Sequence, residues 1–299
     1  MIINQLNNCS LSKNDISVFY KKYFPDRELN IDNPKTFTEK IQWLKFYDCI
    51  AEKTYCADKI NLRNYCKKTL DNDFCPKILK IYNNVSEIKY EDLPDRFILK
   101  CNHGSNMNIV CKNKAEFNFE AAINKLAFWS NINFSDYCKM CEYHYNNIER
   151  KIFLEEFIDI ECEYKFWCFN GITKLCQVIF YDDCPTIPNA PMDWRRLDIL
   201  VDTNFNLTNF WFNHTGISRP YNIKEYVKEH YKKYKFDDFI TFVNLSQRLA
   251  NSFKFVRVDW YRTSNNKMYL SEMTFTPAAG IMKFEFSESD VEIGKMLRL

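Results

Sequence analysis

The stretch Phe255-Val-Arg257-Val-Asp259-Trp-Tyr-Arg-Thr-Ser-Asn-Asn-Lys-Met-Tyr-Leu-Ser-Glu272-Met-Thr274 decides the fold of the C-terminal part of this chain. Its two ends are rich in aromatic and β-branched residues, and the polar residues 264–267 separate them, which predicts a β-hairpin. Asn tolerates the positive φ of a tight turn, so we expect Asn265 and Asn266 to form a two-residue loop. Ser264 then faces Lys267, and the register of every outer pair follows.

This register places Asp259 opposite Glu272, and Arg257 opposite Thr274. Facing carboxylates repel each other and destabilise a strand pair. A divalent cation held between them would remove this repulsion, and the pair would form a metal site, since Mg²⁺ prefers one or two carboxylates together with substrate phosphates. Alternatively, Arg257 neutralises the pair alone, because it lies two residues from Asp259 on the same face. The residues by themselves leave both interpretations open.

Composition bounds the class of protein. A chain of 299 residues suffices for one large domain or two modest ones, and its net charge of +2 gives no sign of a nucleic-acid partner. No run of 18 or more apolar residues and no signal peptide is present, so we expect a cytoplasmic protein without membrane insertion. The 13 scattered cysteines are typical of reduced thiols, and the spacing of Cys138 and Cys141 lacks the second pair that a zinc site needs.

The pattern of apolar residues predicts an α+β chain with a helical N-terminal third. Thr36 and Glu39 have the spacing of a capping box at the start of a helix, and Asn170-Gly171 marks a hairpin turn between strands at 164–169 and 173–181. Further helices are expected at 57–68, 115–130, 222–234, 237–252 and after 287, and further strands at 96–100, 109–112, 151–158, 197–201 and 207–212.

A second constellation is Lys100-Cys-Asn-His103-Gly104-Ser105-Asn-Met-Asn108, in which a strand ends in a small polar loop. Backbone amides in such a loop can bind phosphate oxygens, and Lys100 supplies a positive charge. Lys59 would be a second cation. The spaced glycines of a P-loop are absent, and the alternative is an ordinary polar turn with solvated lysines.

The segment Phe153-Leu-Glu155-Glu156-Phe157-Ile158 reads as a strand running into a hinge. Its main chain would contact an adenine edge, and a carboxylate a few residues later, Glu161 or Glu163, would hold ribose hydroxyls. The alternative is an amphipathic strand edge with its charges in solvent.

Taken in order, these motifs resemble the TupA-like branch of the ATP-grasp superfamily, which is named for teichuronopeptide biosynthesis. The resemblance runs from about residue 33 to residue 280. Its markers are Asn33-Pro-Lys-Thr-Phe-Thr-Glu-Lys-Ile-Gln-Trp-Leu-Lys45, Ala57-Asp-Lys59, Leu93-Pro94, Leu99-Lys-Cys-Asn-His-Gly-Ser105, Tyr164-Lys-Phe-Trp-Cys-Phe-Asn-Gly171 and Ser271-Glu-Met-Thr-Phe-Thr-Pro-Ala-Ala-Gly280.

The resemblance implies an ATP-grasp fold, in which two α+β lobes grip ATP. Residues 1–90 would form a mainly helical N-terminal region, 91–160 the small lobe with the phosphate loop, and 161–299 the large lobe with the Mg²⁺ site. The implied nucleotide contacts are Lys59 and Lys100 on phosphates, the loop His103-Gly104-Ser105 over them, the main chain of Glu156, Phe157 and Ile158 on adenine with Glu155 nearby, and Glu163 on ribose. Asp259 and Glu272 would ligate Mg²⁺, and Arg257 would face the transferred phosphate.

The activity implied is an ATP-dependent carboxylate–amine ligase acting through an acyl phosphate. Its acceptor is expected to be a uronic acid or amino-acid unit of a surface polysaccharide or of a nucleotide-linked sugar, with substrate contacts from Arg195 and Arg196 in the loop at 185–196. Two departures from the superfamily stand out: Thr274 replaces the Asn of the usual Glu-x-Asn metal motif, and the phosphate loop has one glycine. A small-molecule kinase and a non-catalytic nucleotide-binding protein of a polysaccharide-assembly complex remain alternatives, while a glycosyltransferase is disfavoured because the usual Asp-x-Asp motif is missing.

Overall fold

The computed structural model describes residues 11–181, 196–213 and 223–299, so Arg195 and most of the expected loop at 185–196 lie outside the described residues. The chain divides into two compact units. The first comprises Met1–Lys22 and Leu44–Asp159, and the second comprises Tyr23–Trp43 and Ile160–Leu299. The three regions expected from the sequence, with boundaries at 90 and 160, stay a prediction.

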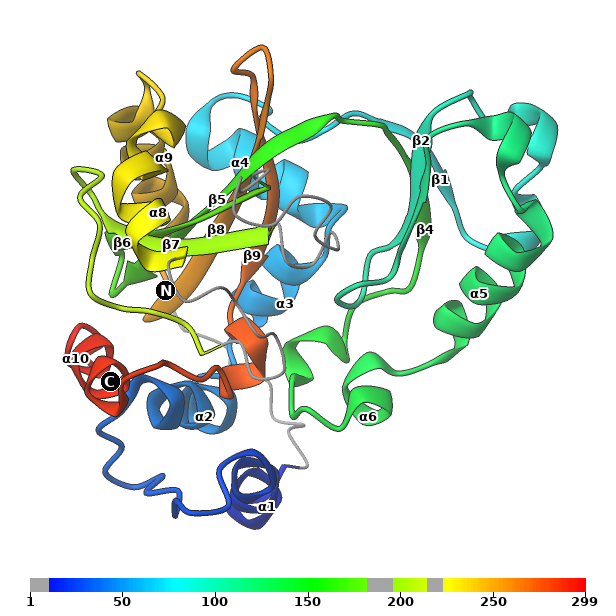
Figure 1. Cartoon of the computed structure of the whole chain (residues 1–299). Helices are drawn as coiled ribbons and strands as arrows, with labels where there is room; N and C mark the ends of the chain where they lie inside the picture. The colour runs from blue at the N-terminus through cyan, green and yellow to red at the C-terminus, as the bar shows by residue number, and fades with distance from the viewer. Residues whose placement is uncertain (1–10, 182–195, 214–222) are drawn as a thin grey trace. The chain divides into compact units, whose positions relative to one another are not determined.

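The first unit is built on a four-stranded antiparallel sheet with the order β1-β4-β2-β3. The strands are β1 (Ile78–Tyr82), β2 (Phe97–Cys101), β3 (Asn108–Cys111) and β4 (Ile152–Glu156). Helix α5 (Phe119–Asn131) lies along one face, where its buried Leu126 and the buried Phe97 and Leu99 of β2 form a core (Figure 1). The sequence did not predict β1, because this edge strand leaves three consecutive residues exposed and so lacks the alternation of a half-buried strand.

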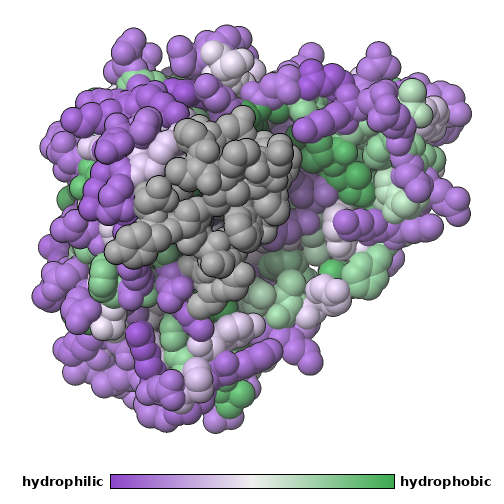
Figure 2. Space-filling view, viewed as in Figure 1, coloured by the Kyte–Doolittle hydropathy of each residue, from purple (hydrophilic) through white to green (hydrophobic). Residues whose placement is uncertain are grey.

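The opposite face of this sheet carries both charge and apolar surface. Cross-strand pairing places Lys100 of β2 and Glu155 of β4 on the same face as Ile81 and Val110. Ile81 is 44% exposed and Val110 is 48% exposed. Figure 2 shows hydrophobic surface over this sheet on an otherwise largely hydrophilic view of the molecule.

The helices of the first unit are α1 (Lys13–Tyr23), α3 (Ala51–Ala57), α4 (Asn61–Leu70) and α6 (Phe134–Cys138). The single helix expected at 57–68 was wrong at its start, because the chain breaks between α3 and α4. Asp58 causes the break: its carboxylate accepts hydrogen bonds from the Ile60 amide (2.9 Å) and the Asn61 side chain (2.8 Å), as an Asp does where a helix begins.

The second unit is built on a five-stranded antiparallel sheet with the order β7-β6-β5-β8-β9. The strands are β5 (Ile160–Phe169), β6 (Ile172–Tyr181), β7 (Arg196–Asp202), β8 (Phe255–Thr263) and β9 (Met268–Thr274). Asn170 and Gly171 have φ values of 49° and 78°, so the predicted two-residue turn between β5 and β6 is confirmed. The strand expected at 207–212 was wrong: Leu207 and Phe212 form only isolated bridges, to Val201 and Phe284.

Helix α9 (Phe239–Ala250) covers one face of this sheet, and the Trp260 indole donates a hydrogen bond to Ser246 on it (2.9 Å). The unit also contains α8 (Ile223–His230), the single turn η6 (Pro277–Gly280) and α10 (Ser287–Lys295). Helix α2 (Phe37–Tyr47), whose residues up to Trp43 belong to this unit, has the predicted capping box, in which Glu39 accepts from the Thr36 amide (2.9 Å) and donates its own amide to Thr36 (3.2 Å). Among the described residues, no helix is both long and apolar enough to cross a membrane.

Candidate active site

The β2–β3 loop presents backbone amides that are available to an anion. Strand pairing ends where the Cys101 amide donates to the Met107 carbonyl (2.9 Å). Within the described part of the chain, the amides of residues 103–106 donate to no acceptor. Asn106 is left-handed, with φ of 57°, which turns the chain within this run. Successive amides in such a turn can form a concave anion-binding nest, and phosphate binding by this loop stays a prediction.

The base of this loop is fixed by Asn102, a residue that sequence reasoning missed. Its side chain is buried, donates to Asp58 (3.0 Å) and to the Glu149 carbonyl (2.9 Å), and accepts from the Lys151 amide (2.8 Å). Three of its four side-chain hydrogen-bonding positions are thereby used on two separate segments, one at Asp58 and one at 149–151. The only signal in the sequence was an Asn at the end of an apolar strand, which is too common to be specific.

His103 and Gly104 hold the loop against the unit's core. Burial lowers the pKa of His103 to about 4, so the ring is neutral near pH 7, and its Nε2 lies 3.2 Å from the Trp129 carbonyl, to which it donates. Burial thus opposes a positive charge on His103. A Cβ atom on Gly104 would lie 2.6 Å from the Phe134 ring, so glycine is required for this close approach.

Two lysines flank the loop, and the structure gives each a partner. The Lys59 ammonium donates to the Gly104 carbonyl, and the Lys59 amide donates to the Asn102 carbonyl (3.4 Å). Lys100 forms an ion pair with the buried Glu155, which also pairs with Arg63 of α4 (2.9 Å). Arg63 was not predicted, because its approach to β4 depends on the packing of α4.

Some backbone groups at the end of β4 and after it already form hydrogen bonds within the protein, and others do not. The Glu156 amide donates to the Lys77 carbonyl (2.9 Å), and its carboxylate accepts from the Lys77 amide (2.8 Å). In contrast, the amides of Phe157 and Ile158 have no acceptor among the described residues. The Phe157 ring lies under the Arg96 guanidinium at 4.1 Å. The contact with adenine thus stays a prediction for Phe157 and Ile158, and the amide of Glu156 is already used.

In the second unit, a charged cluster occupies the face of the sheet opposite α9. The pairing of β5, β8 and β9 aligns Lys165, Asp259 and Glu272 in one row across three strands. Asp259 accepts from both Arg257 Nε (2.8 Å) and Arg257 Nη2 (2.6 Å), and its Oδ2 also lies 3.1 Å from Lys165 Nζ. Lys165 in turn pairs with Glu163 (2.9 Å). Lys165 was missed because its place beside Asp259 depends on the long-range pairing of β5 with β8.

Burial sets the electrostatics of this cluster. It raises the pKa of Asp259, and Arg257 and then Lys165 oppose that rise. Burial acts most strongly to lower the pKa of Lys165, but Asp259, Glu163 and Glu272 together outweigh it, so that pKa is raised overall. Glu272 is more open, with 31% of its side chain exposed, and its Oε1 accepts from the Thr274 hydroxyl (3.0 Å) and lies 3.6 Å from Arg257 Nη2.

These residues suit Mg²⁺ in donor chemistry, since two carboxylates and a hydroxyl offer the hard oxygen ligands it prefers. Among the described residues, no group of three or more His, Cys, Asp or Glu side chains is arranged to hold a metal. Phosphate oxygens or water would therefore complete the coordination. In the present arrangement Arg257 and Lys165 neutralise Asp259, as the second interpretation of the sequence expects, and a metal would share Asp259 with them.

The two antiparallel sheets with their helices are those of an ATP-grasp fold. The chain belongs to the TupA-like ATP-grasp family, whose model matches residues 39–185 and 197–298. No curated protein matches the chain.

Solved structures with a similar fold are distant in sequence. An L-amino acid ligase from Bacillus licheniformis is 10% identical with a TM-score of 0.43, covering 89% of this chain and 56% of that one. The D-alanine–D-alanine ligase from Bacillus anthracis complexed with ATP is 14% identical with a TM-score of 0.38, covering 74% of this chain and 55% of that one. The chain thus spans little more than half of the length of either protein.

Proposed function

We propose that this protein is an ATP-dependent carboxylate–amine ligase. The observation that carries the proposal is the run of four loop amides at 103–106 that donate to no described residue, with the Lys59 ammonium on the Gly104 carbonyl, in a chain of the ATP-grasp family. The named L-amino acid ligase and D-alanine–D-alanine ligase agree with this class of activity.

In the first proposed step, the substrate carboxylate attacks the γ-phosphate of ATP and releases ADP, giving an acyl phosphate. The loop amides and Lys59 bind phosphate oxygens, and Lys100 adds a positive charge while Arg63 keeps Glu155 paired. Mg²⁺ bound to Asp259 and Glu272 would neutralise phosphate charge. In the second step, an amine attacks the acyl carbon, inorganic phosphate leaves, and the amine loses a proton to give the amide.

Arg257 is proposed to stabilise the negative charge that develops on the acyl oxygen. Its position is fixed by two hydrogen bonds to Asp259 and by the Thr274 hydroxyl, which accepts from Nη2 (3.3 Å). A donor held in place before the reaction costs no reorganisation during it. By the family resemblance, the acceptor is proposed to be a uronic acid or amino-acid unit of a surface polysaccharide or of its nucleotide-sugar precursor.

The experiment is to measure ADP release with Mg-ATP while pooled uronates, nucleotide-linked uronic sugars and amino acids are screened against pooled small amines. The ligase requires both a carboxylate and an amine for sustained release. Release that is unchanged without any amine would instead favour the kinase. ATP binding without release across all pools would favour the non-catalytic alternative.

A further inference from the structure

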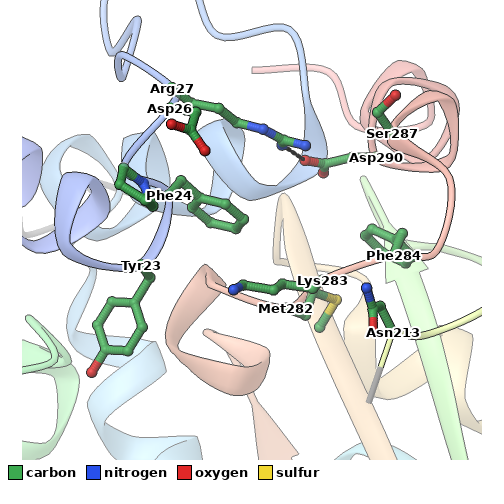
Figure 3. A pocket seen from close by; sticks show the side chains of 11 residues that line it. Tyr23, Phe24, Asp26, Arg27, Asn213, Met282, Lys283, Phe284, Ser287 and Asp290 are labelled. Atoms are coloured by element: carbon green, nitrogen blue, oxygen red, sulfur yellow. Dashed lines mark hydrogen bonds and ion pairs between the residues drawn. The ribbon is translucent and has the colours of Figure 1, made fainter. Parts of the chain in front are cut away.

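A pocket of about 260 Å³ lies within the second unit, and its described lining includes none of the charged residues on β5, β8 and β9 (Figure 3). Three segments supply most of its wall: the chain after α1, the chain after η6, and the first turn of α10. Its described lining residues are Tyr23, Phe24, Pro25, Asp26, Arg27, Asn213, Met282, Lys283, Phe284, Ser287 and Asp290. The volume is near the lower end of small-molecule sites, which suits one compact molecule.

Arg27 is held in place on one side of this pocket. Its Nη1 donates to Asp290 (3.2 Å), and its guanidinium lies 5.1 Å from the Phe24 ring centroid. Asp290 is itself buried and accepts from the Thr38 amide (2.9 Å) and hydroxyl (2.7 Å). Only one of the five N–H donors of Arg27 is used on a described residue, and 40% of the side chain is exposed. The other donors are available to a ligand.

Lys283 supplies a second cation from the facing side. Figure 3 shows its side chain across the pocket from Arg27, with the Phe24 ring between the two. Its backbone is fixed where the Asn213 amide donates to the Lys283 carbonyl (2.8 Å) and where Phe284 bridges to Phe212. Its ammonium forms no ion pair with any described residue.

The remaining wall is mixed in character. Phe24, Met282 and Phe284 give apolar surface, and the aromatic pair Phe212–Phe284 stacks at 5.6 Å behind it. Asp290 is committed to Thr38 and Arg27, which leaves Asp26 as the exposed carboxylate of the lining. Two cations therefore face a compact, partly apolar space, and a carboxylate on a small ring or aliphatic body matches that arrangement.

The chain also connects this pocket to the candidate metal ligands. β9 ends at Thr274, the turn η6 follows, and the next residues, Met282 and Lys283, line the pocket. The Gln42 side chain fixes η6 by donating to the carbonyls of Ala279 (3.2 Å) and Gly280 (2.9 Å). A ligand in the pocket would therefore contact a segment that follows Glu272 and Thr274 in the chain and is joined to them by a turn that hydrogen bonds hold in place.

We propose that this pocket binds the small carboxylate substrate, with its carboxylate on the remaining donors of Arg27, its body against Phe24 and Phe284, and Lys283 supplying positive charge from the facing side. Calling the ligand a substrate rests on the proposed ligase function, whereas the binding of a small carboxylate in this pocket does not. A sugar acid and an α-amino acid share the required chemistry. In either case Asp26 accepts from the ligand's hydroxyl or ammonium group.

The test is calorimetric binding to the full chain without ATP. The probes are glucuronate and alanine, each paired with an analogue that lacks the carboxylate, namely glucose and alaninol. We expect one of the two acids to bind and its analogue to bind more than about tenfold more weakly, as expected when hydrogen bonds to a charged group are lost. Equal binding of each acid and its analogue, or no binding of either acid, would overturn the proposal.

Variants then locate the site. Lys283→Gln should weaken binding of the acid by about tenfold without affecting folding, because the side chain is exposed. Arg27→Lys keeps a cation for Asp290 and should weaken binding of the acid to a similar extent. Lys174→Gln, at an exposed position of β6, is the matched control. Unchanged affinity in both pocket variants would contradict the site.

Turnover separates this proposal from the ligase function. If ADP release occurs and the pocket variants raise KM for the carboxylate with little change in KM for ATP, both the pocket assignment and the ligase function are supported. If release occurs with KM for the carboxylate unchanged, the pocket assignment fails and the ligase remains. If no release is found but Lys283→Gln still weakens acid binding, the binding site stands and the ligase function fails.

Discussion

Asp259 on β8 lies directly opposite Glu272 on β9, and the hairpin reaches this register through two compensating irregularities. At the turn, the Thr263 amide donates to the Lys267 carbonyl (3.0 Å), so the loop has three residues and ends in Asn266 with φ of 62°. The expected two-residue loop was therefore wrong. A bulge then shifts the register between Asp259 and Trp260, which restores the pairing of Asp259 with Glu272.

Replacing Glu272 with Gln should remove most turnover while preserving the fold. The Glu272 side chain is 31% exposed, and Gln at this position can still accept the hydrogen bond that Glu272 accepts from the Thr274 hydroxyl (3.0 Å). A lost metal ligand is expected to lower kcat by more than about a hundredfold, in line with removal of a key electrostatic group. ADP release at increasing Mg²⁺ measures this, with a thermal melt as the control for folding. Wild-type turnover in this variant would remove Glu272 from the metal site.

Replacing Asp259 with Ala should destabilise the protein as well as inactivate it. The change leaves Arg257 without its two hydrogen bonds (2.8 and 2.6 Å) and Lys165 without one of its carboxylates. Removing one partner of a buried ion pair costs about 3–5 kcal/mol. Urea unfolding measures the loss. The control is Glu292→Gln, which breaks the exposed pair with Lys295 and should cost at most about 1 kcal/mol. Equal stability of the two variants would contradict the central place of Asp259 in the cluster.

Replacing Lys59 with Gln should weaken binding of Mg-ATP. Its ammonium donates to the Gly104 carbonyl, so it lies at the loop whose amides are proposed to bind phosphate. Loss of a charged donor is expected to reduce affinity by about tenfold or more, and the difference should shrink at high salt. Calorimetric titration at two salt concentrations measures both effects. Lys67→Gln, at an exposed position of α4, serves as the control and should bind nucleotide normally.

Acid should destabilise the first unit through its buried histidines. Burial lowers the pKa of His103 from 6.5 to about 4 and that of His144 to about 3. Between these values and pH 6.5, the unfolded chain binds protons that the folded chain does not, so stability falls as pH decreases from about 6.5 towards 4.

His103→Gln should reduce that dependence, because Gln cannot gain a proton yet can still donate to the Trp129 carbonyl. The free energy of unfolding is compared at pH 7 and pH 5. His144 remains and leaves a smaller slope, and the exposed His230→Gln is expected to behave as the wild type. An unaltered slope in His103→Gln would show that His103 is not the group that titrates.

Local signals predicted the elements that depend on neighbouring residues. The capping box of Thr36 and Glu39, the Asn170-Gly171 turn and the helix after Ser287 are all present, because each is fixed by contacts within a few residues. Elements that depend on distant partners were less well predicted. β1 is an exposed edge strand, and residues 207–212 have apolar content but form only isolated bridges.

The sequence by itself determined the family of this protein, the antiparallel hairpin that carries Asp259 and Glu272, and the polar loop at 103–106, because these are encoded in short motifs with local hydrogen-bonding rules. Tertiary structure alone decided which cations meet those groups. Lys165 reaches Asp259 because β5 pairs with β8, and the fold brings Arg63 of α4 within ion-pair distance of Glu155 of β4. Likewise, Arg27 and Lys283 share one pocket although 256 positions separate them in the sequence (283 − 27 = 256). Such contacts depend on the closure of long loops and on packing, and no short stretch of sequence specifies these.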